Sequence, residues 1–242
     1  THRSPCKVNL FLRILGRRPN GFHDLASLFQ AVSLSDTMYF SRLPSGTTQD
    51  EMGCSAGNLP VDDSNLVIKA FNLMRAKTGL TDAYFKVYLD KHVPMQAGLG
   101  GGSANAATAM HAFNQLMDRP ASLEEMVEWS GDIGSDITFF FTTGTAYCTG
   151  RGENVISISA LPGAPDIKVH IFKPSEGLST GKVFGALDLE NVNPIQPRDL
   201  LSLWKTNPLD AATEGGLVND LEPPAFFCEP SLLRLKRAIE DC

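Results

Sequence analysis

The sequence contains no long apolar run. A membrane-spanning helix needs roughly 18 or more apolar residues, and the strongest candidate in the chain, Ile137–Phe141, is far shorter. The first five residues, Thr-His-Arg-Ser-Pro, do not form the apolar segment of a secretory signal peptide. We therefore expect no membrane helix, no signal peptide and no membrane partner.

Basic residues and cysteines are also scarce. The chain has 21 Lys and Arg against 27 Asp and Glu, a formal net charge of −6. This balance lacks the electrostatic footprint of a nucleic-acid-binding protein, so we expect no nucleic-acid partner. The five cysteines form no C-x-x-C pair, which disfavours a zinc knuckle or a disulfide framework and favours reduced thiols. They are Cys6, Cys54, Cys148, Cys228 and Cys242.

What the chain does contain is typical of a globular protein: 242 residues, 43% apolar and 20% charged, enough for one large domain or two modest ones. Alternating apolar residues predict strands over 7–15, 25–40 and 83–90, with strand-like patterns over 137–148 and 166–173. Helical spacing and capping residues predict helices over 64–78, 103–117, from Ser122 onward, and over 231–240. A Pro- and Gly-rich stretch at 161–165 indicates a boundary.

The most informative segment is Pro94–Ala107, which has four glycines between a predicted strand and a predicted helix. Glycine permits positive φ and close approach of the backbone, and a helix N-terminus attracts phosphate. The Walker A pattern fails because no lysine follows the glycines, and the Rossmann pattern fails because Ser103 stands at the third glycine position. A flexible linker is the alternative, although linkers seldom join a clean strand to a capped helix.

Three ordered segments resemble one family. Pro94–Ala107 resembles the phosphate-binding motif of the GHMP kinases. Ser4–Leu12 with Gly21–Leu25, and Gly131–Phe140, resemble the 4-diphosphocytidyl-2-C-methyl-D-erythritol kinase family. The segments Glu128–Ser130 and Gly144–Gly152 resemble the plant and algal forms of that family. The resemblance covers most of residues 4–185. It implies a two-domain α+β fold: a ribosomal protein S5 domain 2-like ATP-binding domain over 1–160, and the start of a ferredoxin-like domain over 161–242 that the family continues further.

The resemblance also implies an activity: ATP-dependent phosphorylation of a hydroxyl on the methylerythritol moiety, giving the 2-phosphate, in the non-mevalonate route to isoprenoids. It implies a plastid stroma, with a transit peptide absent from this chain, or else a bacterial cytoplasm. We expect a small-molecule substrate and a monomer or weak homodimer. The alternatives are another GHMP kinase acting on mevalonate-type alcohols, homoserine or a sugar, a nucleotide-binding relative without catalysis, and a binding module.

By the same resemblance, Asp136 is the catalytic base, and Lys7 is a second catalytic residue that lies near it and offsets the developing charge; a purely structural Lys–Asp pair is the alternative. Mg²⁺ would arrive with ATP, held by its phosphates and by Ser103. Asn65 and Lys91 match positions near the adenosine, with a helix cap and a solvated charge as their respective alternatives. The implied ATP-binding residues are Asn65, Lys91, Pro94, Met95, Gln96, Ala97, Gly98, Leu99, Gly100, Gly101, Gly102, Ser103, Ala104 and Asn105.

The resemblance places the cytidine end of the substrate among aromatic side chains. Phe22 and Phe184 match the residues that cover the two faces of the base, and His23 matches the residue that bonds its edge. Asn9 and Thr180 match further substrate contacts. Stacking requires only a flat apolar face, so Phe at position 22, where the family commonly has Tyr, preserves it. Taken alone, Phe184 is more typical of a core residue.

Overall fold

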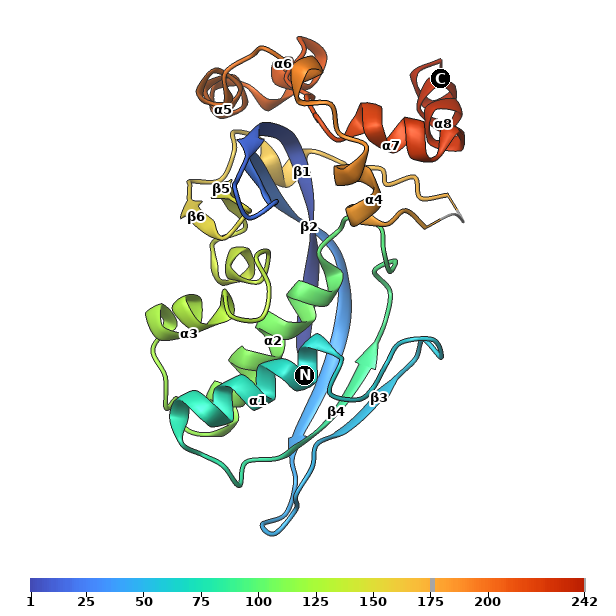
Figure 1. Ribbon diagram of the computed structural model, residues 1–242. Coiled ribbons are helices and arrows are strands. Elements are labelled where there is room, and N and C mark those ends of the chain that lie inside the picture. Colours follow the sequence, from blue (N-terminus) through green and yellow to red (C-terminus); the bar gives the residue numbers. More distant parts are fainter. Residues whose placement is uncertain (175–176, 242) are drawn as a thin grey trace. The chain divides into compact units, whose positions relative to one another are not determined.

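The computed structural model describes residues 1–174 and 177–241 (Figure 1). The chain divides into two compact units. Unit 1 comprises Thr1–Val8, Ala31–Met95 and Leu99–Gly144, and unit 2 comprises Asn9–Gln30, Gln96–Gly98 and Thr145–Cys242. Strands β1 (His2–Arg17) and β2 (His23–Arg42) pair with each other and give residues to both units. The predicted boundary near residue 160 therefore coincides with neither unit, and it stays a prediction for the family's domains.

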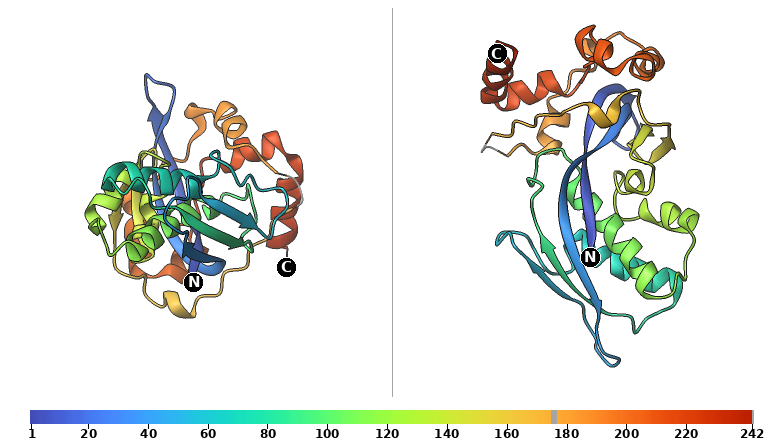
Figure 2. Two further views of the ribbon diagram at one scale, coloured as in Figure 1. Left: turned by 90° about the horizontal axis from the view of Figure 1, so that it is seen from below. Right: turned by 180° about the vertical axis from the view of Figure 1, so that it is seen from behind.

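Unit 1 is a sheet covered by helices. β4 (Phe85–Asp90) pairs antiparallel with the end of β2 and parallel with β3 (Glu51–Cys54). The alternation that predicts β4 reflects burial of Phe85, Val87 and Leu89 on one face. Helices α1 (Leu66–Thr78) and α2 (Gly101–Leu116) cover one face of these strands (Figure 2) and enclose a core that includes Phe71, Met110 and Phe113.

Local signals set most helix ends in this unit. The Asn65 side chain accepts from the Val67 N–H at the start of α1, and Gly79, with φ 74°, ends that helix. Ser122 and Glu125 form the predicted capping box of α3 (Leu123–Ser130). The strand-like pattern over 137–148 is only partly right: Thr138–Phe141 is a 3₁₀ helix, and the strand begins at Thr145.

Unit 2 pairs the first half of β2 with β5 (Thr145–Gly150), and β5 with β6 (Asn154–Ser157). Its short helices are η2 (Ala164–Asp166), α4 (Thr180–Gly185), η3 (Leu189–Asn191), α5 (Pro197–Thr206), α6 (Pro208–Thr213), α7 (Glu222–Cys228) and α8 (Pro230–Glu240). The predicted last helix is confirmed as α8. The strand-like segment 166–173 is wrong: it finds no ladder partner within the described part of the chain, and an unpaired segment is not a strand.

Buried polar contacts hold β1 to distant residues within unit 2. Arg13 Nε donates to Asp220 Oδ2 at 2.8 Å, and the Ile14 N–H donates to the same oxygen at 2.7 Å. Four cysteines are free thiols, and Cys242 lies outside the described residues. Over residues 1–174 and 177–241, no helix is both long and apolar enough to cross a membrane.

Candidate active site

A buried lysine faces a partly open carboxylate in unit 1. Lys7 lies on β1 with 6% of its side chain exposed, and its Nζ is 3.5 Å from Asp136 Oδ2. Asp136, in the turn that leads into the 3₁₀ helix, keeps 33% of its side chain exposed. A carboxylate that solvent can reach, beside an ammonium that is shielded from it, can accept a proton while the ammonium offsets negative charge.

The glycine-rich segment lies directly against this pair. The Lys7 N–H donates to the Leu99 carbonyl at 2.9 Å. Gly100 has φ 67°, and a Cβ placed there would lie 3.1 Å from Lys7 Cγ and 3.2 Å from Phe140 Cζ. Both its conformation and its surroundings therefore favour glycine. Because residue 100 is glycine, the backbone can contact the side-chain carbons of Lys7.

Helix α2 begins immediately after Gly100. The Ala104 N–H donates to the Gly100 carbonyl at 2.8 Å, so the preceding N–H groups of Gly101, Gly102 and Ser103 have no acceptor within their own helix. Such N–H groups, with the positive end of the helix dipole, form an anion-binding surface. Unit 1 thus brings together the Gly100 turn, Lys7 and Asp136.

The remaining residues of the segment divide between the units. Pro94 and Met95 follow β4 in unit 1, whereas Gln96–Gly98 belong to unit 2. Gln96, at φ 53°, and Gly98, at φ 70°, both adopt left-handed backbone conformations. Gln96 and Gly98 line a cavity of about 610 Å³ in unit 2 together with Thr180 and Lys182.

Asp36 is not among the residues that the sequence predicts, and its carboxylate is fully buried. It accepts from Lys91 Nζ at 2.6 Å and from Asn105 Nδ2 at 2.9 Å. Lys91 is therefore no solvated charge, and its ammonium is already paired. Asn65 is engaged as well, because its oxygen caps α1 and its Nδ2 donates to the Pro60 carbonyl at 2.6 Å. No sequence signal identifies Asp36, since its partners lie more than 50 residues away.

The residues expected around cytidine all lie in unit 2. The rings of His23 and Phe184 stack with centroids 5.1 Å apart and an interplanar angle of 24°. Burial, and then the positive charge of Arg17, lower the pKa of His23 below its usual value. The imidazole is therefore mainly neutral at pH 7, and the neutral form has one donor and one acceptor nitrogen. Phe184 also packs on the core residues Leu12, Ile14 and Leu25.

Two of the remaining expected contacts, Phe22 and Asn9, have clear positions. Phe22 is 54% exposed, and the guanidinium of Arg151 lies 5.1 Å from its ring centroid, over one face. Asn9 Nδ2 donates to Ser27 Oγ at 3.2 Å. An exposed ring and a half-buried amide of this kind fit a flat, hydrogen-bonding ligand.

The donor set of unit 1 does not hold a metal by itself. In the part of the chain that the structure describes, no three His, Cys, Asp or Glu side chains gather as a metal site. A magnesium ion here would take its oxygen ligands mainly from phosphate groups and solvent, with Ser103 at the start of α2 as a protein ligand.

Comparisons with known proteins define the class first. Residues 65–144 match the family model of the GHMP kinases N-terminal domain. Crystal structures of a homoserine kinase from Cytophaga hutchinsonii (TM-score 0.61, 14% identity, covering 93% of this chain and 75% of that one) and of a mevalonate kinase (TM-score 0.58, 12%, covering 87% and 72%) share the fold. The architecture is that of a GHMP kinase.

More similar relatives define the family. 4-Diphosphocytidyl-2-C-methyl-D-erythritol kinase of Protochlamydia amoebophila is 45% identical over 98% of this chain and 76% of its own length. The chloroplastic enzyme of Oryza sativa is 53% identical, and there the chain covers 57% of the relative. A crystal structure of 4-(cytidine 5'-diphospho)-2C-methyl-D-erythritol kinase matches with TM-score 0.74 and 29% identity, covering 97% of this chain and 80% of that one. The chain belongs to the 4-diphosphocytidyl-2-C-methyl-D-erythritol kinase family and spans little more than half the length of its plant relatives.

Proposed function

We propose that this protein transfers the γ-phosphoryl group of ATP to a hydroxyl on the methylerythritol moiety of 4-diphosphocytidyl-2-C-methyl-D-erythritol, giving the 2-phosphate. The observation that carries the proposal is the contact of Lys7 with both Asp136 and the Gly100 turn. Phosphoryl transfer depends on positioning and charge stabilisation, and this arrangement supplies a base, a cation and phosphate-binding N–H groups in one compact unit.

Each group has one role in the transfer. Asp136 accepts the proton of the substrate hydroxyl as its oxygen forms a bond to the γ-phosphorus. The bond from that phosphorus to the β,γ-bridging oxygen breaks, and ADP leaves with the electron pair. The Lys7 ammonium offsets charge on the reacting oxygens, and the N–H groups of residues 101–103 hold the phosphates. Mg²⁺, when bound with ATP, neutralises further phosphate charge.

The residues of unit 2 recognise the cytidine end in this proposal. Phe22 and Phe184 offer ring faces, and the neutral His23 offers one donor and one acceptor to the base edge. Asn9 and Thr180 supply further polar contacts. The Lys91 ammonium is bound by Asp36, so in this proposal that group does not contact the nucleotide.

We place the protein in a plastid stroma, by analogy with the chloroplastic relatives, with a bacterial cytoplasm as the alternative because bacterial relatives also match. A monomer or weak homodimer acting on this small molecule is part of the same proposal.

The test is ATP-dependent phosphorylation of the cytidyl substrate, with mevalonate and homoserine as competing alcohols. We expect turnover of the cytidyl compound alone, and a loss of about 10²–10⁴-fold in kcat for Asp136→Asn, which keeps the shape of the side chain but removes the base. Turnover of another alcohol instead would refute the substrate. Full activity of Asp136→Asn would refute the mechanism.

A further inference from the structure

Asp36 forms a saturated hydrogen-bond centre in unit 1. Its Oδ1 accepts from the backbone N–H groups of His92 at 2.8 Å and Val93 at 2.7 Å. Its Oδ2 accepts from Lys91 Nζ at 2.6 Å and Asn105 Nδ2 at 2.9 Å. A carboxylate has about four acceptor positions, and all of them are used. Asp36 is completely buried, and the Lys91 side chain is 6% exposed.

The four donors come from the two segments that flank the Gly100 turn. Residues 91–93 follow β4 on the chain leading into the turn, and Asn105 lies one helical turn into α2. Asn105 Nδ2 also donates to Ser4 Oγ at 3.0 Å, and Ser4 is on the same strand as Lys7. The Asp36 carboxylate therefore links the segment before the Gly100 turn to the segment after it, next to β1.

Two of the residues bound to Asp36, Lys91 and Val93, also lie against Gly101, the first residue of α2. A Cβ at Gly101 would lie 2.9 Å from Val93 Cγ1 and 3.2 Å from Lys91 Nζ. The backbone of Gly101 therefore lies directly against both side chains. A displacement of the 91–93 segment would therefore act directly on the start of α2.

From this geometry we infer that Asp36 is a positioning residue for ATP: it fixes the N-terminal N–H groups of α2 relative to Lys7. Asp36 is fully buried and its acceptor positions are filled, so it acts through Lys91, Val93 and Asn105. In this inference the Lys91 ammonium binds Asp36 and does not contact the adenosine. The inference rests on the proposed function, since the ligand of those N–H groups is the phosphate chain of ATP.

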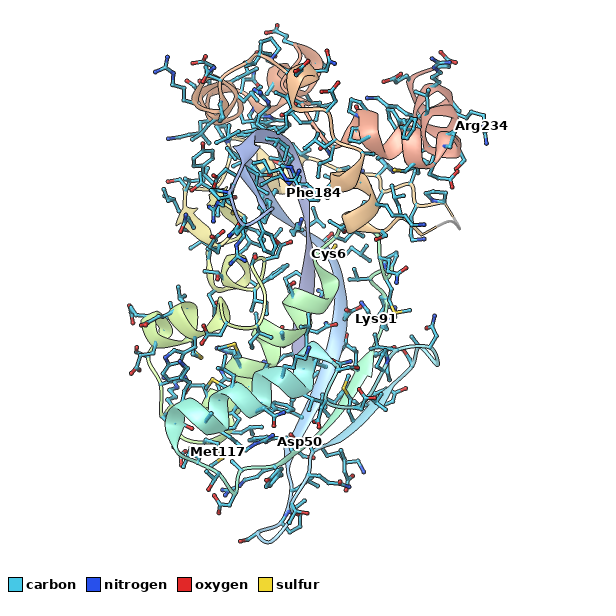
Figure 3. All side chains as sticks on the ribbon, in the orientation of Figure 1. Cys6, Asp50, Lys91, Met117, Phe184 and Arg234 are labelled. Atoms are coloured by element: carbon cyan, nitrogen blue, oxygen red, sulfur yellow. The ribbon has the colours of Figure 1, made fainter. Side chains whose placement is uncertain are left out.

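The test compares two buried aspartates in the full-length protein. Asp36→Asn replaces one acceptor oxygen by an amide that faces donors and leaves Lys91 without its counter-ion. Asp50→Asn is the matched control: Asp50 has 3% of its side chain exposed, pairs with Arg75 at 2.7 Å and accepts from the Phe85 N–H. Asp50 precedes β3, whereas Lys91 follows β4, so the two lie at opposite ends of this parallel pair (Figure 3).

Because small displacements of positioning groups cost up to about a hundredfold, we expect Asp36→Asn to raise KM for ATP about ten- to a hundredfold at a temperature where it is folded. KM for the cytidyl substrate should change less than about twofold. Asp50→Asn should lose stability but keep the wild-type KM for ATP. Equal KM values for ATP in Asp36→Asn and the wild type, or equal increases in the two variants, would overturn the inference.

Two further variants keep the test decisive if Asp36→Asn does not fold. Asn105→Ala leaves the Asp36–Lys91 pair intact and should raise KM for ATP several-fold. Asp36→Asn with Lys91→Met removes both charges, so stability should recover while KM for ATP stays high. Recovery of both together would show a merely structural role. A wild type that binds no ATP by calorimetry would refute the proposed function and this inference with it, whereas an active wild type with unaffected variants refutes the inference alone.

Discussion

The substitution Gly100→Ala tests the contact between the Gly100 turn and Lys7, the lysine of the proposed active site. Two separate effects follow from the structure. A non-glycine residue at φ 67° is strained by about 1 kcal/mol. The added Cβ would also lie 3.1 Å and 3.2 Å from Lys7 Cγ and Cε, which is overpacking that costs about 1–3 kcal/mol more.

The strain alone can be measured at Gly79. This glycine has φ 74° at the end of α1 and has no heavy atom within 4 Å of an added Cβ. Gly79→Ala should therefore lower the free energy of unfolding by about 1 kcal/mol and leave kcat unchanged. Gly100→Ala should lower it by roughly 2–4 kcal/mol, the sum of strain and overpacking.

The functional effect of Gly100→Ala comes from displacement of the lysine. Lys7 Nζ is 3.5 Å from Asp136 Oδ2, and a shift of the lysine stem moves the ammonium away from the reacting oxygens. We expect kcat/KM to fall about tenfold to a hundredfold. Urea denaturation and steady-state kinetics of both variants give the two quantities. If Gly100→Ala matched Gly79→Ala in both, the proposed packing of the turn on Lys7 would be wrong.

Two other predictions concern unit 2. The pKa of His23 is lowered by burial and then by Arg17, so protonation of this histidine opposes folding. The free energy of unfolding should therefore rise with pH between the lowered pKa and about 6.5 and stay constant above it. Urea denaturation across pH 5–8 should show this slope in the wild type and not in His23→Gln. KM for the cytidyl substrate should be flat above that window and rise below it, and a rise centred at pH 7 or higher would contradict the neutral imidazole. Phe184→Ala should raise KM for the cytidyl substrate about two- to twelvefold, which corresponds to the stacking free energy of one aromatic pair, and should leave KM for ATP unchanged. A change in KM for ATP alone would contradict the assignment of Phe184 to the cytidine base.

Several features of this protein could be predicted from the sequence because local patterns determine them. The alternation over 83–90 predicts β4, the Ser122–Glu125 pair predicts the cap of α3, and Pro94–Ala107 predicts a turn and helix suited to phosphate. These signals involve residues within a few positions of one another. The resemblance to a known family then paired Lys7 with Asp136, which no local pattern could have done.

Long-range contacts determined the rest. The segment 166–173 has the composition of a strand, but a strand also needs a partner. Lys91 reads as a surface charge, yet it is buried because Asp36, 55 residues earlier, neutralises it. The sequence by itself thus determined the family, the main helices and the glycine-rich turn before α2. Only the tertiary structure decided how that turn is held, because a buried carboxylate is tolerated only where folding brings donors from distant segments to it.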